Sequence, residues 1–229
     1  MAGADTGRNG DGGEAPLSGI EAKAAAARRR ILDAVIECLD RHGYAETSIN
    51  RIQQQAGVSR GALTHHFPSK EELMVEAAER LLGPTVTPRP RPGVDMADAG
   101  SRGAAVEADI LWMWERMVDT REGRALLEIL VASRTDEALK SRISDTFLRW
   151  NRIINEALAA NYRAFPVSAE EQEDIWTVCR VFLRGLNTQS PFERDDEARR
   201  RLVSRFARMI AERFREGPGP AGSHPGAPG

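Results

Sequence analysis

The sequence has 229 residues, of which 41% are hydrophobic, enough to fill the core of one large domain or two modest ones. Its formal net charge of -2 excludes binding to nucleic acid or an anionic membrane through overall charge, so either function would need a local basic surface. Aromatic residues make up only 6%, and Ala, Leu, Arg and Glu dominate, which favours helices over strands. The expected fold class is all-α.

Cysteine usage and hydropathy indicate in which cellular compartment the protein is expected. Only Cys38 and Cys179 are present, far apart and each inside an amphipathic helical pattern, which suits two buried thiols in a reducing compartment better than a disulfide. No apolar run approaches the roughly 20 residues that span a bilayer, and the N-terminus has no hydrophobic segment of signal-peptide type. We therefore expect a cytoplasmic protein without a membrane partner.

The first predicted helix follows a Gly-rich, polar tail over residues 1–19, which has little to bury and is expected to be disordered. Order is expected from Ile20. Apolar residues then recur at the spacing of one helix face in "RRRILDAVIECLDRHG", and Gly43 supplies a C-terminal stop.

A short second helix and a turn come next. Thr47 or Ser48 can cap this helix, because a hydroxyl at that position accepts a hydrogen bond from an unpaired backbone N–H of the first turn. The helix is expected to end near Ala56. Gly57 then permits a tight turn.

The third predicted helix begins at a cap provided by Ser59 and runs through Phe67. Val58 and Leu63 flank the cap at the positions where two apolar side chains pack together and fix how the chain enters the helix. Pro68 stops the helix. The geometry of the turn is therefore specified locally.

A fourth helix begins with a capping box, in which Ser69 is followed three residues later by Glu72, and it ends near Leu82. Residues 20–82 are therefore predicted to form one helical domain, with the fourth helix as its connection to the rest of the chain.

The remainder is predicted to contain a linker, a second domain and a tail. Residues 83–103 are rich in Pro and Gly and read as a long connection. Helical periodicity resumes in five segments of residues 104–216, which predict the larger domain. Residues 217–229 are Gly- and Pro-rich and are expected to be disordered.

The last two of these five predicted helices carry broad apolar stripes. One stripe consists of Ile175, Val178, Cys179, Phe182, Leu183 and Leu186; the other consists of Leu202, Val203, Phe206, Met209, Ile210 and Phe214. Both stripes can close the domain's own core, or part of each can pack against a second copy of the chain. The sequence does not divide the residues between these two roles.

Two short helices joined by a glycine turn form a helix-turn-helix, whose second helix can enter the major groove of DNA. At about 100° per residue, Leu63 and Phe67 point to one side of that helix. The other side carries Gly61, Thr64 and His65, with Arg60 at the border. No Asp or Glu lies between Thr47 and Lys70, so this stretch is locally basic.

The residue types on the outward side suit contact with DNA. Arg60 can pair with guanine through two hydrogen bonds, a contact that contributes roughly 1 to 3 kcal/mol of base discrimination. Gly61 leaves room for close approach of the backbone. Thr47, Ser48 and Lys70 lie at helix N-termini, where backbone N–H groups and the helix dipole favour phosphate.

The stretch "TSINRIQQQAGVSRGALTHHFPSKEELMVEAAERL" resembles the DNA-binding domain of the TetR family of bacterial transcriptional regulators, and the resemblance covers about residues 28–82. It implies a homodimer that binds a double-stranded DNA operator, with a larger helical domain that binds a small molecule and dimerises through its last two helices. By position it places Thr47 and Ser48 against phosphate, Arg60, Gly61, Thr64 and His65 toward the groove, His66 near the DNA backbone and Lys70 on phosphate. Thr64 stands where that family most often has tyrosine.

A metal site is the main alternative for His65 and His66. Adjacent helical residues diverge by about 100°, whereas helical metal pairs use a spacing of four to share a face. The sequence therefore predicts no metal site. It also predicts no cofactor and no catalytic residue, because both cysteines resemble core residues and no glycine-rich phosphate loop follows a strand.

Aromatic and methionine side chains in the second domain are candidates for a ligand pocket, because cavities between helices lined in this way often bind small molecules. Each residue taken alone is as well explained by ordinary core packing. The candidates are Trp112, Met113, Trp114, Met117, Phe147, Trp150, Trp176 and Cys179.

The sequence thus predicts a sequence-specific regulator of transcription, acting as a repressor that a small molecule releases from DNA. Two alternatives remain. A helical DNA-binding architectural protein would show little sequence preference and no response to a ligand, and a small all-α enzyme would not bind DNA at all.

Overall fold

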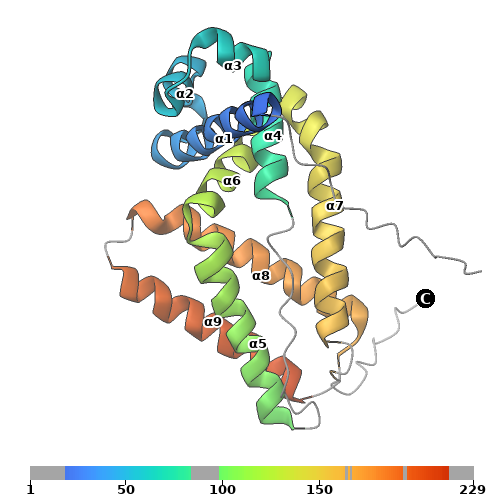
Figure 1. The fold of residues 1–229 in the computed structure, drawn as a ribbon. Helices are drawn as coiled ribbons and strands as arrows, with labels where there is room; N and C mark the ends of the chain where they lie inside the picture. The colour runs from blue at the N-terminus through green and yellow to red at the C-terminus, as the bar shows by residue number, and fades with distance from the viewer. Residues whose placement is uncertain (1–18, 84–97, 163–164, 166, 193–194, 217–229) are drawn as a thin grey trace, which may run out of the picture.

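The structure is a computed structural model that describes residues 19–83, 98–162, 165, 167–192 and 195–216 (Figure 1). All regular secondary structure in these ranges is helical, which confirms the predicted all-α class. The expected N-terminal tail, apart from Gly19, and the expected C-terminal tail lie outside the described residues, as does most of the expected linker.

Four helices form the upper part of the molecule in Figure 1. They are α1 (Gly19–Glu46), α2 (Ile49–Ala56), α3 (Arg60–His66) and α4 (Lys70–Leu81). The side chains of Ser48, Ser59 and Ser69 accept hydrogen bonds from the backbone N–H groups three residues on, at 3.3, 3.2 and 3.1 Å. Serine caps therefore begin α2, α3 and α4 where the sequence predicts them.

Two glycines allow the bends between these helices. Gly43 has φ 73° and ψ 173° and interrupts α1 near its end, at the predicted stop. Gly57 has φ 61° and ψ 39°, and its backbone N–H closes the end of α2 onto Gln53 and Gln54. Both φ values lie in the left-handed region, where a side chain would strain the backbone.

Five more α-helices follow in the described part of the chain: α5 (Ala99–Met113), α6 (Arg121–Ala132), α7 (Glu137–Tyr162), α8 (Ala169–Gln189) and α9 (Asp196–Glu216). A π-helical turn, η1 (Trp114–Val118), extends α5. A 3-10 turn, η2 (Ser190–Phe192), follows α8.

The helix α5 begins inside the segment 83–103 that was predicted to be a linker. The last proline of that segment is Pro92, so the following residues are free to become helical. Asp98 then caps the helix by accepting a hydrogen bond from the N–H of Ser101 at 2.6 Å. The predicted linker is therefore too long at its C-terminal end.

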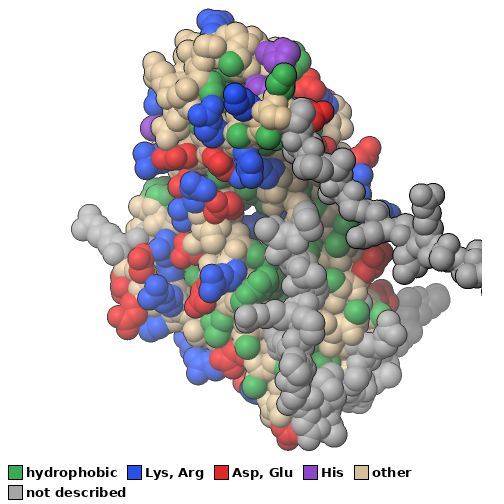
Figure 2. Space-filling model, in the orientation of Figure 1, with side chains coloured by type: hydrophobic (Ala, Val, Ile, Leu, Met, Phe, Trp, Pro, Cys, Tyr) green, Lys and Arg blue, Asp and Glu red, His purple; other side chains and the backbone are tan. Residues whose placement is uncertain are grey.

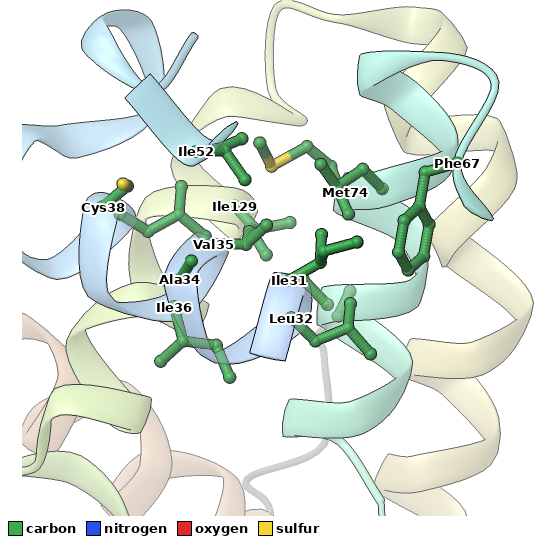
Figure 3. Close-up of a cluster of buried hydrophobic side chains, with 14 of the residues drawn as sticks. Ile31, Leu32, Ala34, Val35, Ile36, Cys38, Ile52, Phe67, Met74 and Ile129 are labelled. Atoms are coloured by element: carbon green, nitrogen blue, oxygen red, sulfur yellow. The ribbon is translucent and has the colours of Figure 1, made fainter. Parts of the chain in front are cut away.

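The first hydrophobic core joins the upper helices to α6 and α7 (Figure 3). Ile31 and Val35 of α1, Ile52 of α2 and Met74 of α4 are all fully buried within it. Ala125 and Ile129 of α6 and Leu139 and Ile143 of α7 belong to the same cluster. The helices that form the predicted DNA-binding part thus share a core with two helices of the larger domain.

The second core lies between α5, α8 and α9, with α5 packed along α9 (Figure 1). Tyr162, Trp176 and Phe214 form an aromatic group in which ring centroids are 5.1 to 6.3 Å apart. In the structure, each of the two apolar stripes has buried and exposed members. Their inward members include Cys179, Leu183, Leu186, Val203 and Phe214, whereas Val178, Leu202 and Met209 are exposed.

Candidate DNA-binding surface and ligand cavity

The helix α3 has one buried and one exposed side. Leu63 and the residue after the helix, Phe67, are 0% and 1% exposed and anchor it to the first core. The exposed residues are Arg60, Gly61, Thr64 and His65. Figure 2 shows histidine and basic side chains at this end of the molecule, with acidic side chains close below them.

The polar side chains of α3 are held in different ways. The Thr64 hydroxyl donates to the carbonyls of Arg60 and Gly61, at 3.0 and 3.2 Å, so it bonds to its own helix. The rings of His65 and His66 meet edge to face with centroids 5.5 Å apart, and His66 is half-buried while His65 is exposed. The two histidines therefore point in different directions, as the helical geometry predicts.

The side chain of Thr47 is turned into the protein. Its side chain is 0% exposed, and its hydroxyl donates to the Gly43 carbonyl at 2.6 Å. Ser48, next to it, is exposed and serves as the cap of α2. The Thr47 side chain therefore fixes the turn between α1 and α2, and the contact of this helix N-terminus with phosphate stays a prediction.

Lys70 lies at the start of α4, half-buried against α1. Its ammonium group donates to the Tyr44 carbonyl at 3.3 Å and stands 4.6 Å from the centre of the Tyr44 ring. These contacts fix the cation beside the helix-turn-helix, where it adds positive charge at the N-terminus of a helix.

Arg28 is a positioning residue that sequence reasoning missed. From α1, its guanidinium group donates to the His66 carbonyl at 3.4 Å and lies 4.7 Å from the centre of the Phe67 ring. It also pairs with Glu76 of α4. Arg28 thereby ties the end of α3 to α1 and α4. The run of three arginines at 28–30 gave no signal as to which of them points inward.

No group of three or more His, Cys, Asp or Glu residues within the described ranges could hold a metal ion. The buried thiols of Cys38 and Cys179 are both free. Burial raises the pKa of both thiols, for Cys179 from 9.0 to about 12, so neither is a reactive thiolate at neutral pH. None of the helices described here is long and apolar enough to cross a membrane.

A cavity of about 780 Å³ opens between α5, α6, α7 and α8, with α1 and α4 at its upper end. Its volume lies in the range of sites for drug-sized molecules. The lining side chains are mostly apolar and aromatic, and they include Trp112, Met113, Met117, Leu126, Trp150, Ile154, Leu158 and Leu183.

Four of the eight candidate ligand residues line this cavity: Trp112, Met113, Met117 and Trp150. Trp114 and Cys179 instead belong to the second core, at 3% and 0% exposure. Trp176 is also buried in that core and borders a second hollow between α7 and α8. Phe147 is not among the lining residues but stacks on Trp150, with ring centroids 6.2 Å apart.

Two arginines of α8, Arg180 and Arg184, also line the cavity, and sequence reasoning missed them. Burial lowers the pKa of both guanidinium groups, for Arg184 from 12.5 to about 10. The available signal was their spacing of four residues, which puts both on one side of the helix.

Comparisons with known proteins also identify the helix-turn-helix. Residues 31–77 match the family model described as bacterial regulatory proteins, tetR family. The HTH-type transcriptional regulator CymR of Pseudomonas putida is 27% identical over 199 residues, which are 84% of this chain and 93% of CymR. The HTH-type transcriptional repressor Rv1474c of Mycobacterium tuberculosis is 43% identical over 54 residues, 24% of this chain and 29% of that repressor.

Among solved structures, a transcriptional regulator from Rhodococcus sp. Rha1 superposes with a TM-score of 0.65 at 20% identity, covering 83% of this chain and 99% of that one. This likeness extends the shared fold beyond the helix-turn-helix to the larger helical domain. The helix-turn-helix therefore matches the tetR family of bacterial regulatory proteins, and the chain as a whole is similar to a transcriptional regulator along nearly the full length of that regulator.

Proposed function

We propose that this regulator represses transcription as a homodimer that binds its operator through α3, and that a small molecule in the cavity between α5 and α8 releases it. One observation carries the proposal: α3 shares the first core with four of the helices that line the cavity, α1, α4, α6 and α7. A ligand that changes the packing of α4 or α6 therefore acts on the support of the DNA-binding helix. We also propose that the protein is cytoplasmic, because the DNA on which it would act lies in that compartment.

Each exposed residue of the helix-turn-helix has a proposed role. Arg60 reads a base edge in the major groove, and Gly61 lets the helix backbone approach the DNA. His65 and Thr64 face the groove beside them. Ser48, His66 and Lys70 fix the register on the phosphate backbone, which carries no sequence information. A hydroxyl already bonded to its own helix makes Thr64 a weaker contact than the tyrosine common in the family.

The dimer is proposed to form through α8 and α9. Val178 and Val181 of α8 are 53% and 66% exposed, and Leu202 and Met209 of α9 are 43% and 63% exposed. Apolar side chains gathered on adjacent helices favour burial against a second copy, because water contact with apolar surface is unfavourable. Phe182 and Phe206 link the two helices by stacking with ring centroids 4.0 Å apart.

Release is proposed to follow from the spacing of the two α3 helices. A dimer reads two half-sites about one DNA turn apart, ~34 to 36 Å or a multiple of it. A ligand that favours another separation lowers operator affinity without contacting DNA. The cavity reaches the supports of the upper helices, since Arg80 and Leu81 at the end of α4 and Gly123 at the start of α6 line it.

The test is a binding assay with the full chain and DNA from the region upstream of its own gene, with the same sequence scrambled as the control. The expected result is a discrete complex with the upstream DNA only, protected in two half-sites related by a twofold axis. Equal binding to both duplexes would favour an architectural protein. Failure to bind either duplex would contradict DNA regulation from this region and leave an enzyme as the alternative to examine.

A further inference from the structure

We infer that the ligand of the cavity is an amphipathic anion, a carboxylate on an aromatic or aliphatic body, which Arg184 and Arg180 recognise from the wall formed by α8. The inference rests on the proposed function for the role of the cavity, and it adds the chemical class of the ligand. The evidence for it is the position of the two guanidinium groups and the kind of group that each of them contacts.

Arg184 is largely buried and has no carboxylate within ion-pairing distance among the described residues. Its guanidinium carbon lies 5.7 Å from the centre of the Phe147 ring and 5.6 Å from that of Trp150. The two rings stack on each other and hold the guanidinium group by cation–π attraction. Ring faces fix the position of a cation but do not neutralise it.

Arg180 adds a second positive charge one helical turn away. It donates to the Asn155 amide oxygen at 3.0 Å and to the Thr177 hydroxyl at 2.9 Å, so both of its close partners are neutral. The Glu173 carboxylate offsets part of this charge electrostatically, and it accepts a hydrogen bond from the Asn155 amide at 2.8 Å. Like charges four residues apart on a helix repel each other, and burial increases the cost.

The other charged groups of the cavity are already engaged or lie at its edge. Arg80 pairs with Asp33, Glu122 pairs with Arg121 at 2.7 Å, and Asp109 accepts a hydrogen bond from the Tyr162 hydroxyl. Arg116 is exposed. The cavity acids therefore have donors of their own, and the positive charge of Arg180 and Arg184 remains for the ligand to offset.

The shape of the site selects the kind of anion. A guanidinium group offers a planar pair of N–H donors that matches a carboxylate, and such charge-assisted bonds are strong in a desolvated site. The apolar part of the lining includes Trp112, Met117 and Leu126 and leaves space for a ring or a chain. A small inorganic anion would leave that surface empty, and a cation would meet two guanidinium groups.

The experiment titrates the full chain by calorimetry with two series of probes that share a body and differ in the head group. One series is 2-naphthoate, 2-naphthamide and 2-naphthylmethylammonium; the other is decanoate, decanol and decylammonium. The carboxylate of at least one series is expected to bind at least tenfold more tightly than its neutral and cationic counterparts. Arg184→Gln is expected to weaken that carboxylate roughly 10- to 100-fold, because a charge-assisted hydrogen bond is lost.

Two controls separate folding from recognition. Arg134→Gln changes an exposed arginine that does not line the cavity and should leave carboxylate binding unchanged. Arg184→Met removes a buried charge that lacks a carboxylate partner, so it should raise the melting temperature of the ligand-free protein while abolishing the preference for the carboxylate. A loss of stability in Arg184→Met, with carboxylate binding retained, would contradict the inference.

The inference is wrong if no carboxylate in either series binds more tightly than its neutral and cationic counterparts. The proposed release from DNA is measured separately, by adding the same probes to the operator complex. A carboxylate that binds through Arg184 yet leaves the operator complex intact supports the anion site and contradicts release. A cation that dissociates the complex supports release and overturns the anion site.

Discussion

Glu128 of α6 accepts a hydrogen bond from the backbone N–H of Tyr44 at 2.9 Å, and this bond joins the end of α1 to the larger domain. Tyr44 is also the residue whose carbonyl holds Lys70. Asp40 and Arg124 make a second link between α1 and α6, with Nε 2.6 Å from a carboxylate oxygen. Helix α6 borders the cavity at its start and contacts α1 farther along, so it can carry a change from one to the other.

Glu128→Ala is expected to reduce the response to ligand more than it reduces DNA binding. Loss of the acceptor should lower the free energy of unfolding by about 1 to 3 kcal/mol, the usual cost of a broken hydrogen bond to a charged group. Thermal denaturation and an operator titration with and without ligand measure the two effects. Glu137→Ala, whose carboxylate pairs with Lys140 in its own helix, is the matched control. An unchanged ligand response would show that coupling does not pass through Glu128.

Arg28→Ala is expected to weaken operator binding although Arg28 is not proposed to contact DNA. The variant loses a cation–π contact and a partly exposed ion pair, together about 1 kcal/mol of stability. It also frees the end of α3, which raises the cost of holding that helix in the groove. Arg29→Ala, an exposed neighbour, serves as the control. Amide exchange of α3 in the free protein should rise in Arg28→Ala only; protection equal to that of the parent would refute the positioning role.

Val181→Asp is expected to convert the dimer to a monomer, because a carboxylate buried against apolar side chains without a partner is strongly unfavourable. Sedimentation velocity at micromolar concentration measures the change. Leu148→Asp provides the comparison, since Leu148 is 64% exposed on α7, a helix that is not part of the proposed interface. If both variants sediment like the parent, or if the parent is already a monomer, the interface through α8 and α9 is wrong.

The buried thiol of Cys179 is expected to make the folded protein less stable at alkaline pH. Burial raises the pKa of its thiol from 9.0 to about 12, so the unfolded chain releases this proton first. The contribution of the thiol to stability is therefore complete below pH 9 and is lost as the pH rises toward 12. Melting temperatures of the parent and of Cys179→Ala should converge over this interval. A constant difference between them from pH 8 to pH 11 would contradict the assignment.

The sequence specified the helix-turn-helix well because its signals are local. Caps at Ser48, Ser59 and Ser69 and the left-handed turn at Gly57 depend on a few neighbouring residues, and the structure has them at the expected positions. Thr47 could not be assigned in this way. Its burial depends on how the chain folds back after Gly43, which places a carbonyl within reach of its hydroxyl.

The larger domain was less predictable because its residues are sorted by tertiary contacts. Periodicity identified the apolar stripe of α8, but only packing separates the buried Cys179 from the exposed Val178 beside it. Arg184 likewise could not be singled out from the sequence. Its charge is ordinary for a helix surface in the sequence, and it becomes informative only because Phe147 and Trp150 enclose it next to a cavity.

The most direct test of the account is the effect of Arg60→Ala on fluorescence anisotropy with labelled operator and with a scrambled duplex. The account predicts a loss of about 1 to 3 kcal/mol on the operator and little change on the scrambled DNA. Lys70→Ala should weaken both duplexes alike and make the salt dependence shallower. If Arg60→Ala bound the operator as tightly as the parent, α3 would not be the helix that reads the sequence.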